Sequence, residues 1–288
     1  MPISSSVLYV VATPIGNLED ISQRALKILR EVDIVAAEDT RVSRVLLDRY
    51  DIKTPMFSLH KFNERKRGDF FVEKLLGGKN VALISDAGTP CISDPGFMLV
   101  KHAHDSGITV TSVCGPSSVM AALSICGYDL SNFSFIGFLP KAREGKKVLE
   151  DIISQGGTYV FFESPKRVKK TVKTICDIEG SVDVCLCNDL SKKFERVYRG
   201  RASDVLNELI ANEHAEKGEY TCVIHIGPQS LPSNDEKPSI EAGIVDIMIK
   251  NNLSLQEAAD ELRARDKKIP KRQIYAAKLR LRDIFRYE

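Results

Sequence analysis

Residues 81–96 read VALISDAGTPCISDPG, and this stretch decides the fold class that the sequence predicts. Its first residues, 81–85, are an apolar run of the length of a buried strand. Residues 85–96 form a loop that is unusually rich in Asp, Gly and Pro, and a helix is predicted over 96–106. A strand, a polar loop and a helix in this order are typical of a crossover unit, in which ligands bind beyond the carboxyl end of the strand.

The same alternation of strand and helix extends in both directions from this unit. Strands are predicted over 7–12, 33–37, 81–85, 108–113, 132–138, 158–163, 182–188, 195–200 and 220–226. Helices are predicted over 41–50, 67–76, 96–106, 118–126, 146–154 and 202–211, with one more that begins at Asp20 as its N-cap and one that begins at Ser164-Pro165. Strands separated by such helices indicate crossover connections and a mainly parallel sheet, so the expected fold class is α/β.

The expected domain organisation follows from length and composition. A chain of 288 residues is long enough for more than one core. We expect an N-terminal α/β domain over 1–116, a second α/β domain over 117–228, a linker over 229–238 and a basic helical C-terminal module over 239–288. The linker is rich in Pro, Ser and charge, and the helical pattern after it includes a capping box at Ser254-x-x-Glu257 and a helix start at Ile269-Pro270. Short helices joined by a basic turn are compatible with a helix-turn-helix-like module.

Charge is balanced over the whole chain but concentrated near its end. The 41 basic and 39 acidic residues give a net charge of +2, yet between Arg263 and Arg286 ten basic residues face two acidic ones. This local excess indicates a surface that faces phosphate, and a solvated helix face is the alternative. With the basic clusters earlier in the chain, the residues expected to contact nucleic acid are Lys61, Arg65, Arg67, Lys141, Arg143, Lys166, Arg167, Lys267, Lys268, Lys271 and Arg272. Phe62, inside the first of these clusters, either stacks on a base or packs in the core.

The seven cysteines are scattered, odd in number and without a Cys-x-x-Cys pair. This pattern predicts neither a disulfide framework nor a zinc site, and Cys185 and Cys187 are interpreted as buried strand thiols rather than metal ligands. No metal site is expected. The N-terminus has no signal-peptide pattern and no apolar run approaches the length of a membrane span, so a cytoplasmic protein is expected.

Three polar turns that are rich in small residues each follow a predicted buried strand. They are 13–20, which reads TPIGNLED, the loop 85–96, and 114–118, which reads CGPSS. The usual nucleotide-binding signatures, a G-x-G-x-x-G fingerprint after a strand and a P-loop, are absent from the sequence. Small residues let the backbone come close to a ligand, and the carboxyl ends of parallel strands meet at one edge of a sheet. The three turns therefore predict a ligand cleft.

Five motifs resemble those of a known family, the small-subunit ribosomal RNA methyltransferase I family, which has the tetrapyrrole-methylase fold. They are ATPIGNLEDI at 12–21, AEDTR at 37–41, the loop 85–96, GFLP at 137–140 and FESPKR at 162–167. The resemblance runs in the family's order over residues 7–227, and the basic helical tail fits as well. Cys114 and Lys166 stand where this family more often has Pro and His.

The resemblance implies two α/β domains with S-adenosylmethionine bound in the cleft between them. It implies methyl transfer to the ribose 2'-hydroxyl of a cytidine in the decoding region of 16S ribosomal RNA, with the small ribosomal subunit as partner and a homodimer as the assembly. By the same resemblance, the residues that bind the cofactor would be Pro14, Ser85, Asp86, Ala87, Gly88, Ile92, Gly115, Ser117, Ser118, Leu139 and Thr221.

Methyl transfer to a hydroxyl requires a group that accepts the hydroxyl proton, because the cofactor supplies only the methyl group. Glu38 and Asp39 are adjacent carboxylates at the end of a predicted strand, and with Arg41 they are the candidate base and orienting groups. Alternatively, Asp39 caps the next helix and pairs with Arg41. Two other functions stay open, C-methylation of a tetrapyrrole by the same fold and non-catalytic binding of ribosomal RNA. The basic C-terminal module favours RNA over a small-molecule substrate.

Overall fold

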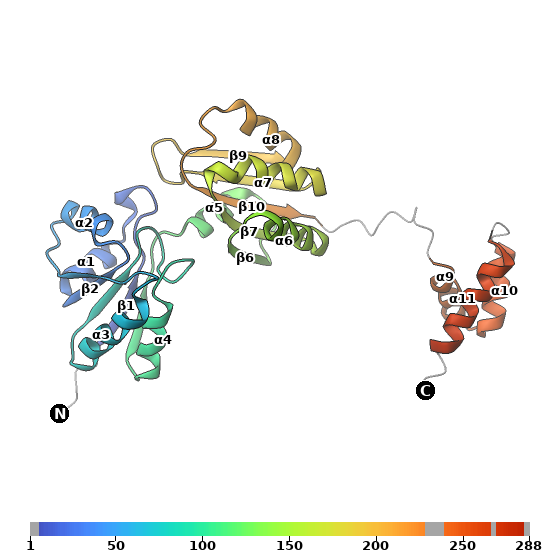
Figure 1. Cartoon of the computed structure of the whole chain (residues 1–288), viewed down its shortest axis with the longest axis horizontal. Coiled ribbons are helices and arrows are strands. Elements are labelled where there is room, and N and C mark those ends of the chain that lie inside the picture. The colour runs from blue at the N-terminus through green and yellow to red at the C-terminus, as the bar shows by residue number, and fades with distance from the viewer. Residues whose placement is uncertain (1–5, 228–238, 266–268, 285–288) are drawn as a thin grey trace. The chain divides into compact units, whose positions relative to one another are not determined.

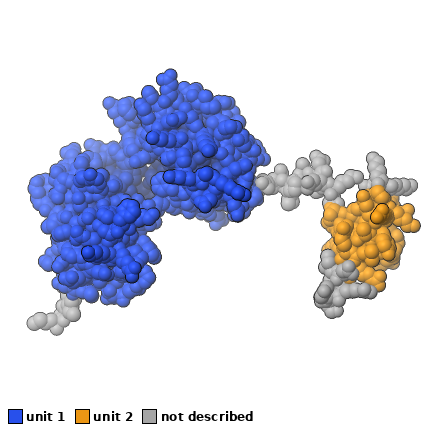
Figure 2. Space-filling model, in the orientation of Figure 1, with its two compact units in different colours: residues 1–227 blue, residues 228–288 orange. Residues whose placement is uncertain are grey.

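The computed structural model describes residues 6–227, 239–265 and 269–284. The chain divides into two compact units, residues 1–227 and residues 228–288 (Figure 2). The larger unit contains two α/β lobes, each built around its own sheet (Figure 1). The expected linker over 229–238 lies outside the described residues.

The first lobe is a five-stranded sheet in the order β3-β2-β4-β1-β5, in which all neighbours are parallel. Its elements are β1 (Val7–Val11), a 3-10 turn (Leu18–Asp20), α1 (Gln23–Glu31), β2 (Ile34–Ala37), α2 (Thr40–Arg49), β3 (Met56–Ser58), α3 (Glu64–Leu76), β4 (Val81–Ile84), α4 (Phe97–Asp105) and β5 (Thr109–Val113). Side chains alternate across a strand, so Val35 and Ala37 pack under α1 and α2 while Ile34 and Ala36 pack under α3 and α4. The sheet is therefore covered on both faces.

The second lobe has a mixed five-stranded sheet in the order β6-β7-β10-β8-β9. Its elements are α5 (Ser118–Cys126), β6 (Phe133–Phe138), α6 (Ala142–Gln155), β7 (Gly157–Glu163), α7 (Pro165–Ile178), β8 (Asp183–Asn188), β9 (Arg196–Arg201), α8 (Ala202–Ala211) and β10 (Tyr220–Ile226). Only β6 and β7 are parallel, and the other three pairings are antiparallel. The expectation of a mainly parallel sheet is thus wrong for this lobe. The segment between β8 and β9 is too short for a crossover, so the two strands form a hairpin.

Two further expectations about local structure need correction. The first helix begins at Gln23 rather than after Asp20, and its N-cap is Ser22, whose hydroxyl accepts a hydrogen bond from the N–H of Ala25 at 3.0 Å. Asp20 is instead the last residue of a short 3-10 helix that precedes α1. The edge strand β3 was not expected, because three residues carry too little periodicity to identify a strand.

The smaller unit is a bundle of α9 (Ile240–Asn251), α10 (Leu255–Arg265) and α11 (Lys271–Ile284) around a small apolar core. The capping box is confirmed, because the N–H of Ser254 donates to Glu257 Oε2 at 2.9 Å and the N–H of Glu257 donates to Ser254 Oγ at 3.3 Å. Lys267 and Lys268 lie outside the described residues. In the part of the chain that is described, no helix is both long and apolar enough to cross a membrane.

Candidate functional site

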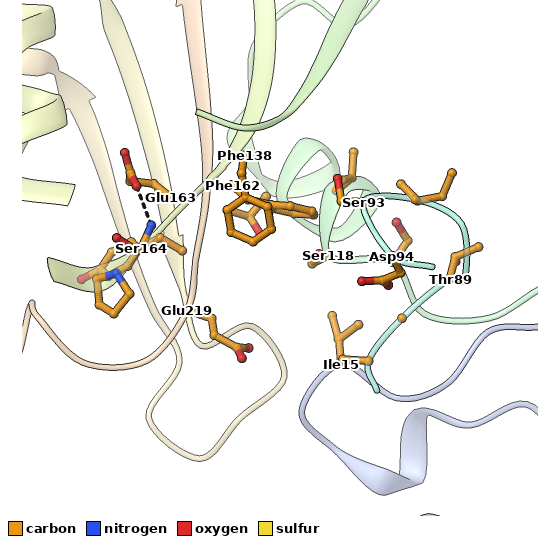
Figure 3. A pocket seen from close by; sticks show the side chains of 18 residues that line it. Ile15, Thr89, Ser93, Asp94, Ser118, Phe138, Phe162, Glu163, Ser164 and Glu219 are labelled. Atoms are coloured by element: carbon orange, nitrogen blue, oxygen red, sulfur yellow. Dashed lines mark hydrogen bonds between the residues drawn. The ribbon is translucent and has the colours of Figure 1, made fainter. Parts of the chain in front are cut away.

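A cavity of about 340 Å³ lies where the loops of the two lobes face each other (Figure 3). The first lobe lines it with the loops that follow β1 and β4, and the second lobe with the start of α5, the ends of β6 and β7 and the start of β10. The lining residues are Ile15, Ala87, Gly88, Thr89, Ile92, Ser93, Asp94, Ser117, Ser118, Val119, Phe138, Phe162, Glu163, Ser164, Pro165, Glu219, Tyr220 and Thr221. The carboxyl edge of the parallel sheet, where ligands bind in open α/β sheets, therefore opens into this cavity.

The loop 85–96 is held in an unusual backbone conformation at the cavity wall. Cys91 and Ser93 have φ angles of 69° and 67°, in the left-handed region that costs energy for residues with a side chain. Gly96 has a φ of 126°, and a Cβ there would meet the side chain of Leu83 at 2.7 Å. Reciprocal backbone hydrogen bonds between Thr13 and Gly88, at 2.8 and 3.1 Å, tie this loop to the loop after β1. Strain that the surrounding structure maintains in this way is typical of ligand sites.

Three carboxyl groups with raised pKa values gather beside this loop. Burial and, to a smaller extent, the neighbouring carboxylate of Glu38 together raise the pKa of Asp94 to about 6, while a hydrogen bond from Ser85 opposes both effects. Burial also raises the pKa of Glu38 and of Asp86 above their ordinary values. Of the three, Asp94 lines the cavity. The cluster gives this wall a negative potential and contains a carboxylate that binds a proton near pH 6.

Asp39 and Arg41 are arranged differently from what a catalytic pair requires. Asp39 Oδ1 accepts from the N–H of Arg41 at 2.9 Å as the N-cap of α2, and Oδ2 accepts from the Arg41 guanidinium at 2.5 Å. These hydrogen bonds lower the pKa of Asp39 to about 2. Both residues line a separate hollow on the first lobe, with Ser85 and Asp86. The arrangement matches the alternative interpretation, a helix cap with an ion pair, and does not support Asp39 as a proton acceptor.

The tetrapyrrole (corrin/porphyrin) methylase family matches this chain over residues 7–206. This chain belongs to the tetrapyrrole methylase family. Within it, the chain is 41% identical over 258 residues to ribosomal RNA small subunit methyltransferase I of Pseudomonas aeruginosa, covering 89% of this chain and 91% of that protein. The protein of the same name from Bacillus subtilis is 37% identical over 275 residues, which are 94% of this chain and 93% of the relative. Its namesake from Thermotoga maritima is 42% identical over 221 residues, which are 75% of this chain but 97% of that protein.

Solved structures show the same methylase fold at low sequence identity. Diphthine synthase aligns with a TM-score of 0.59 at 15% identity, covering 77% of this chain and 90% of its own. Uroporphyrin-III-C-methyltransferase from Thermus thermophilus aligns with a TM-score of 0.51 at 17% identity, covering 76% of this chain and 94% of that one. The expected α/β fold class with two tetrapyrrole-methylase lobes is confirmed.

The structure brings about half of the expected cofactor residues of this methylase into the cavity. Ala87, Gly88, Ile92, Ser117, Ser118 and Thr221 line it. Pro14, Ser85 and Asp86 line the neighbouring hollow of the first lobe, and Gly115 lines a third one. Leu139 is only 4% exposed and belongs to the core of the second lobe, where its N–H donates to the carbonyl of Phe162 at 3.1 Å.

Several lining residues of the methylase cavity were not among the expected cofactor residues. Asp94 lies inside the loop 85–96, which the sequence predicted to line a ligand cleft. The composition of this loop does not distinguish Asp94 from Asp86. Phe138, Phe162 and Glu163 lie within the two second-lobe motifs at the ends of strands, a position that could have identified them. Glu219 and Tyr220 have no comparable signal, because Glu219 directly precedes strand β10 and Tyr220 begins it, so that neither lies at the end of a strand.

The second-lobe wall of the cavity is held by a buried ion pair. The side chain of Glu163 is 0% exposed and pairs with the guanidinium of Arg167 at 2.6 Å. Glu163 also accepts from the hydroxyl of Thr171 at 2.6 Å, and the same guanidinium donates to the carbonyl of Leu139 at 2.9 Å. Arg167, which was expected to contact RNA, is thus engaged within the lobe.

The other basic residues that are expected to bind RNA have accessible side chains in most cases. Lys61, Arg65, Lys141, Arg143 and Lys166 are exposed in the larger unit, and Lys271 and Arg272 are exposed in the smaller unit. Arg67 is half-buried, with its guanidinium 5.7 Å from the centre of the Phe70 ring.

Cys185 and Cys187 are buried in the second sheet. In the described ranges, no three His, Cys, Asp or Glu side chains come together as a metal site would require.

Proposed function

We propose that this methyltransferase uses S-adenosylmethionine to methylate a ribose 2'-hydroxyl of a cytidine in the decoding region of 16S ribosomal RNA. The observation that carries the proposal is the cavity between the lobes, walled by the strained loop 85–96 and the half-buried carboxyl of Asp94, in a chain of this family. The substrate class is supported by relatives named ribosomal RNA small subunit methyltransferase I at 37–42% identity. We also propose that the chain acts in the cytoplasm as a homodimer, a state that analytical ultracentrifugation can test.

The chemistry of the cavity suits a donor that carries both positive and negative groups. The raised-pKa carboxyls of Asp94, Glu38 and Asp86 favour a sulfonium or an ammonium beside the loop 85–96. At the amino end of α5, Ser117 and Ser118 present a helix terminus that suits a carboxylate. The volume of about 340 Å³ lies in the range of small-molecule pockets. When bound, S-adenosylmethionine supplies an electrophilic methyl group, which no side chain of the protein provides.

The proposed task of Asp94 is to accept the proton of the ribose hydroxyl. An aspartate whose pKa is about 6 is largely ionised at neutral pH, yet it is a stronger base than an ordinary aspartate. Glu38 contributes by keeping this pKa high through its own charge. The aromatic rings of Phe138 and Phe162, whose centroids are 5.3 Å apart, give the cavity an apolar wall on the second-lobe side.

The exposed basic residues would hold the RNA by its phosphates. On the larger unit these are Lys61, Arg65, Lys141, Arg143 and Lys166, with half-buried Arg67 at their side. Lys271 and Arg272 begin α11 in the smaller unit. The 221 matched residues are 97% of the Thermotoga maritima relative but only 75% of this chain. That relative therefore has few residues left that could form a C-terminal unit like the one in this chain. The C-terminal unit is therefore proposed to add affinity for RNA rather than to take part in the chemistry.

Mass spectrometry of nucleosides from 16S ribosomal RNA tests this proposal. Cells that lack the protein should lose one 2'-O-methylcytidine, and adding purified protein and S-adenosylmethionine to their small subunits should restore it. An Asp94→Asn variant that binds the donor with normal affinity is the control. It should not restore the methylated nucleoside if the restoration depends on the proposed active site. Unchanged RNA from the deletion strain, together with methylation of a tetrapyrrole by the purified protein, would replace the proposal with its rival.

A further inference from the structure

Phe62 is the most exposed large apolar side chain of the described residues, at 96%. It lies in a turn between β3 and α3, after His60, whose ring meets that of Phe62 edge-on with centroids 6.1 Å apart. The structure therefore excludes the core packing that the sequence left open for this residue. A single exposed apolar residue is common and is not by itself evidence of a binding site. Evidence for a function of Phe62 must therefore come from the segment that carries it and from the residues around it.

The turn that carries Phe62 is attached to the loop that lines the cavity. Glu64, two residues after Phe62, accepts hydrogen bonds at Oε1 from the N–H of Gly96 at 2.9 Å and of Met98 at 2.8 Å. Gly96 closes the loop that contains Asp94. On the other side, the N–H of His60 donates to Asn63 Oδ1 at 2.8 Å, which closes the turn around Phe62. The turn that carries the exposed ring is thus attached to the cavity wall.

The surroundings of the exposed ring are strongly basic. Lys61, Arg65 and Lys66 are exposed, and none of the three forms an ion pair with any residue that the structure describes. Glu64 is the acidic residue among 61–67, and its carboxylate is used by two backbone N–H groups. An exposed aromatic ring surrounded by unpaired cations is the arrangement that proteins use for single-stranded nucleic acid, because bases stack on the ring while cations bind the phosphates.

We propose that Phe62 is a stacking platform for an unpaired base of the RNA that flanks the target nucleotide, with Lys61, Arg65 and Lys66 on the adjoining phosphates. The inference rests on the proposed function, because it takes the substrate to be RNA. Stacking requires an unpaired base, so the platform selects substrates in which the nucleotides next to the target are not in a duplex. It also positions the target relative to Asp94 through Glu64 and the loop 85–96.

The absence of tryptophan from the chain makes a direct test possible. In the full-length Phe62→Trp protein, the new indole is the sole tryptophan and reports stacking by fluorescence quenching. An unpaired pyrimidine oligoribonucleotide should quench it, whereas an RNA duplex of the same length and inorganic polyphosphate should bind with little quenching. Equal quenching by polyphosphate, or none by the single strand, overturns the proposal. Quenching by RNA-free ribosomal proteins but not by RNA would also overturn it, because the surface would then bind protein.

Removal of the ring gives a second, independent measurement. Phe62→Ala should weaken binding of the single strand by about tenfold and leave duplex binding unchanged. Phe62→Tyr should restore most of the affinity. Leu76→Ala is the matched control, because Leu76 is 65% exposed at the far end of helix α3, which follows the turn with Phe62, and its replacement should have no effect on either RNA. Affinity that is equal in the wild type and Phe62→Ala contradicts the platform.

These outcomes are separate from those that test the proposed function. A wild-type protein that methylates small-subunit RNA, with an unaltered KM in Phe62→Ala, would refute the platform alone. A protein that shows the stacking signal but transfers no methyl group to RNA would refute the proposed function and leave the binding surface in place.

Discussion

Replacing Asp94 with Asn should remove most of the methyl transfer and at the same time stabilise the folded protein at neutral pH. Asn has nearly the same shape as Asp but cannot accept the hydroxyl proton. General-base catalysis contributes about 100-fold to 10,000-fold to rate, so kcat should fall by at least about 100-fold. The affinity for S-adenosylmethionine should change much less, because the rest of the cavity wall is intact.

The expected gain in stability follows from the raised pKa of Asp94. A carboxyl whose pKa rises from 3.8 to about 6 binds its proton more tightly in the folded chain than in the unfolded one. The folded state therefore loses stability as the pH rises from about 4 to about 6, and it does not regain it at higher pH. The shift corresponds to about 3 kcal/mol in the absence of solvent screening, and we expect about 1 to 2 kcal/mol because the carboxyl is only partly buried. Asn has no charge and escapes this cost.

Two assays measure these effects. Transfer of a labelled methyl group to small subunits gives kcat and KM, and the pH profile of kcat/KM should have an ascending limb near pH 6 for the wild type and none for Asp94→Asn. Thermal unfolding should show the variant to be more stable than the wild type at about pH 7.5 and equally stable at about pH 4. A variant that keeps wild-type turnover, or that is less stable at about pH 7.5, would refute the reasoning.

Three further predictions concern the cavity, the buried ion pair and the C-terminal unit. Ala87→Leu places a larger side chain in the cavity from an exposed position, so the Kd for S-adenosylmethionine should rise at least about tenfold in calorimetry with little change in Tm; unchanged affinity would place the donor elsewhere. Arg167→Ala leaves the buried Glu163 unpaired and should destabilise the larger unit by about 3 kcal/mol in urea unfolding. Normal stability combined with a loss of RNA binding would instead indicate that Arg167 contacts RNA. Deletion of residues 228–288 should leave the donor Kd unchanged, since the cavity is built from the larger unit alone. The same deletion should lower the slope of log K against log salt by about 0.7 for each lost phosphate contact, and an unchanged slope would remove the C-terminal unit from the RNA surface.

Much of the first lobe could be predicted because its signals are local. The loop 85–96 stands out by composition, and the strands beside it are continuous apolar runs, as expected where helices cover both faces of a sheet. The direction of strands in the second lobe is not a local property. It depends on which strands pair. In sequence β8 resembles the buried strands of the first lobe, and only the short segment between β8 and β9 indicates that these two strands form a hairpin.

The candidate base could not be chosen from sequence, because burial rather than residue type sets the pKa of a carboxyl. Asp39 and Asp94 both follow strands of the same sheet, yet Asp39 is bonded to Arg41 at the surface and Asp94 faces the cavity among other carboxyls. Likewise, the exposure of Phe62 and the internal partners of Arg167 depend on packing. In the sequence both residues lie in basic clusters. In the structure the ring of Phe62 is open to solvent, whereas the guanidinium of Arg167 is paired with Glu163 inside the second lobe.

A crystal structure of the protein with S-adenosylhomocysteine bound tests the central claim most directly. We predict that the ligand occupies the cavity between the lobes, in contact with the loop 85–96, the start of α5 and the segment at Thr221, with its sulfur near Asp94. Density for the ligand at another place, or a cavity closed by the protein's own side chains in the presence of saturating ligand, would contradict the account.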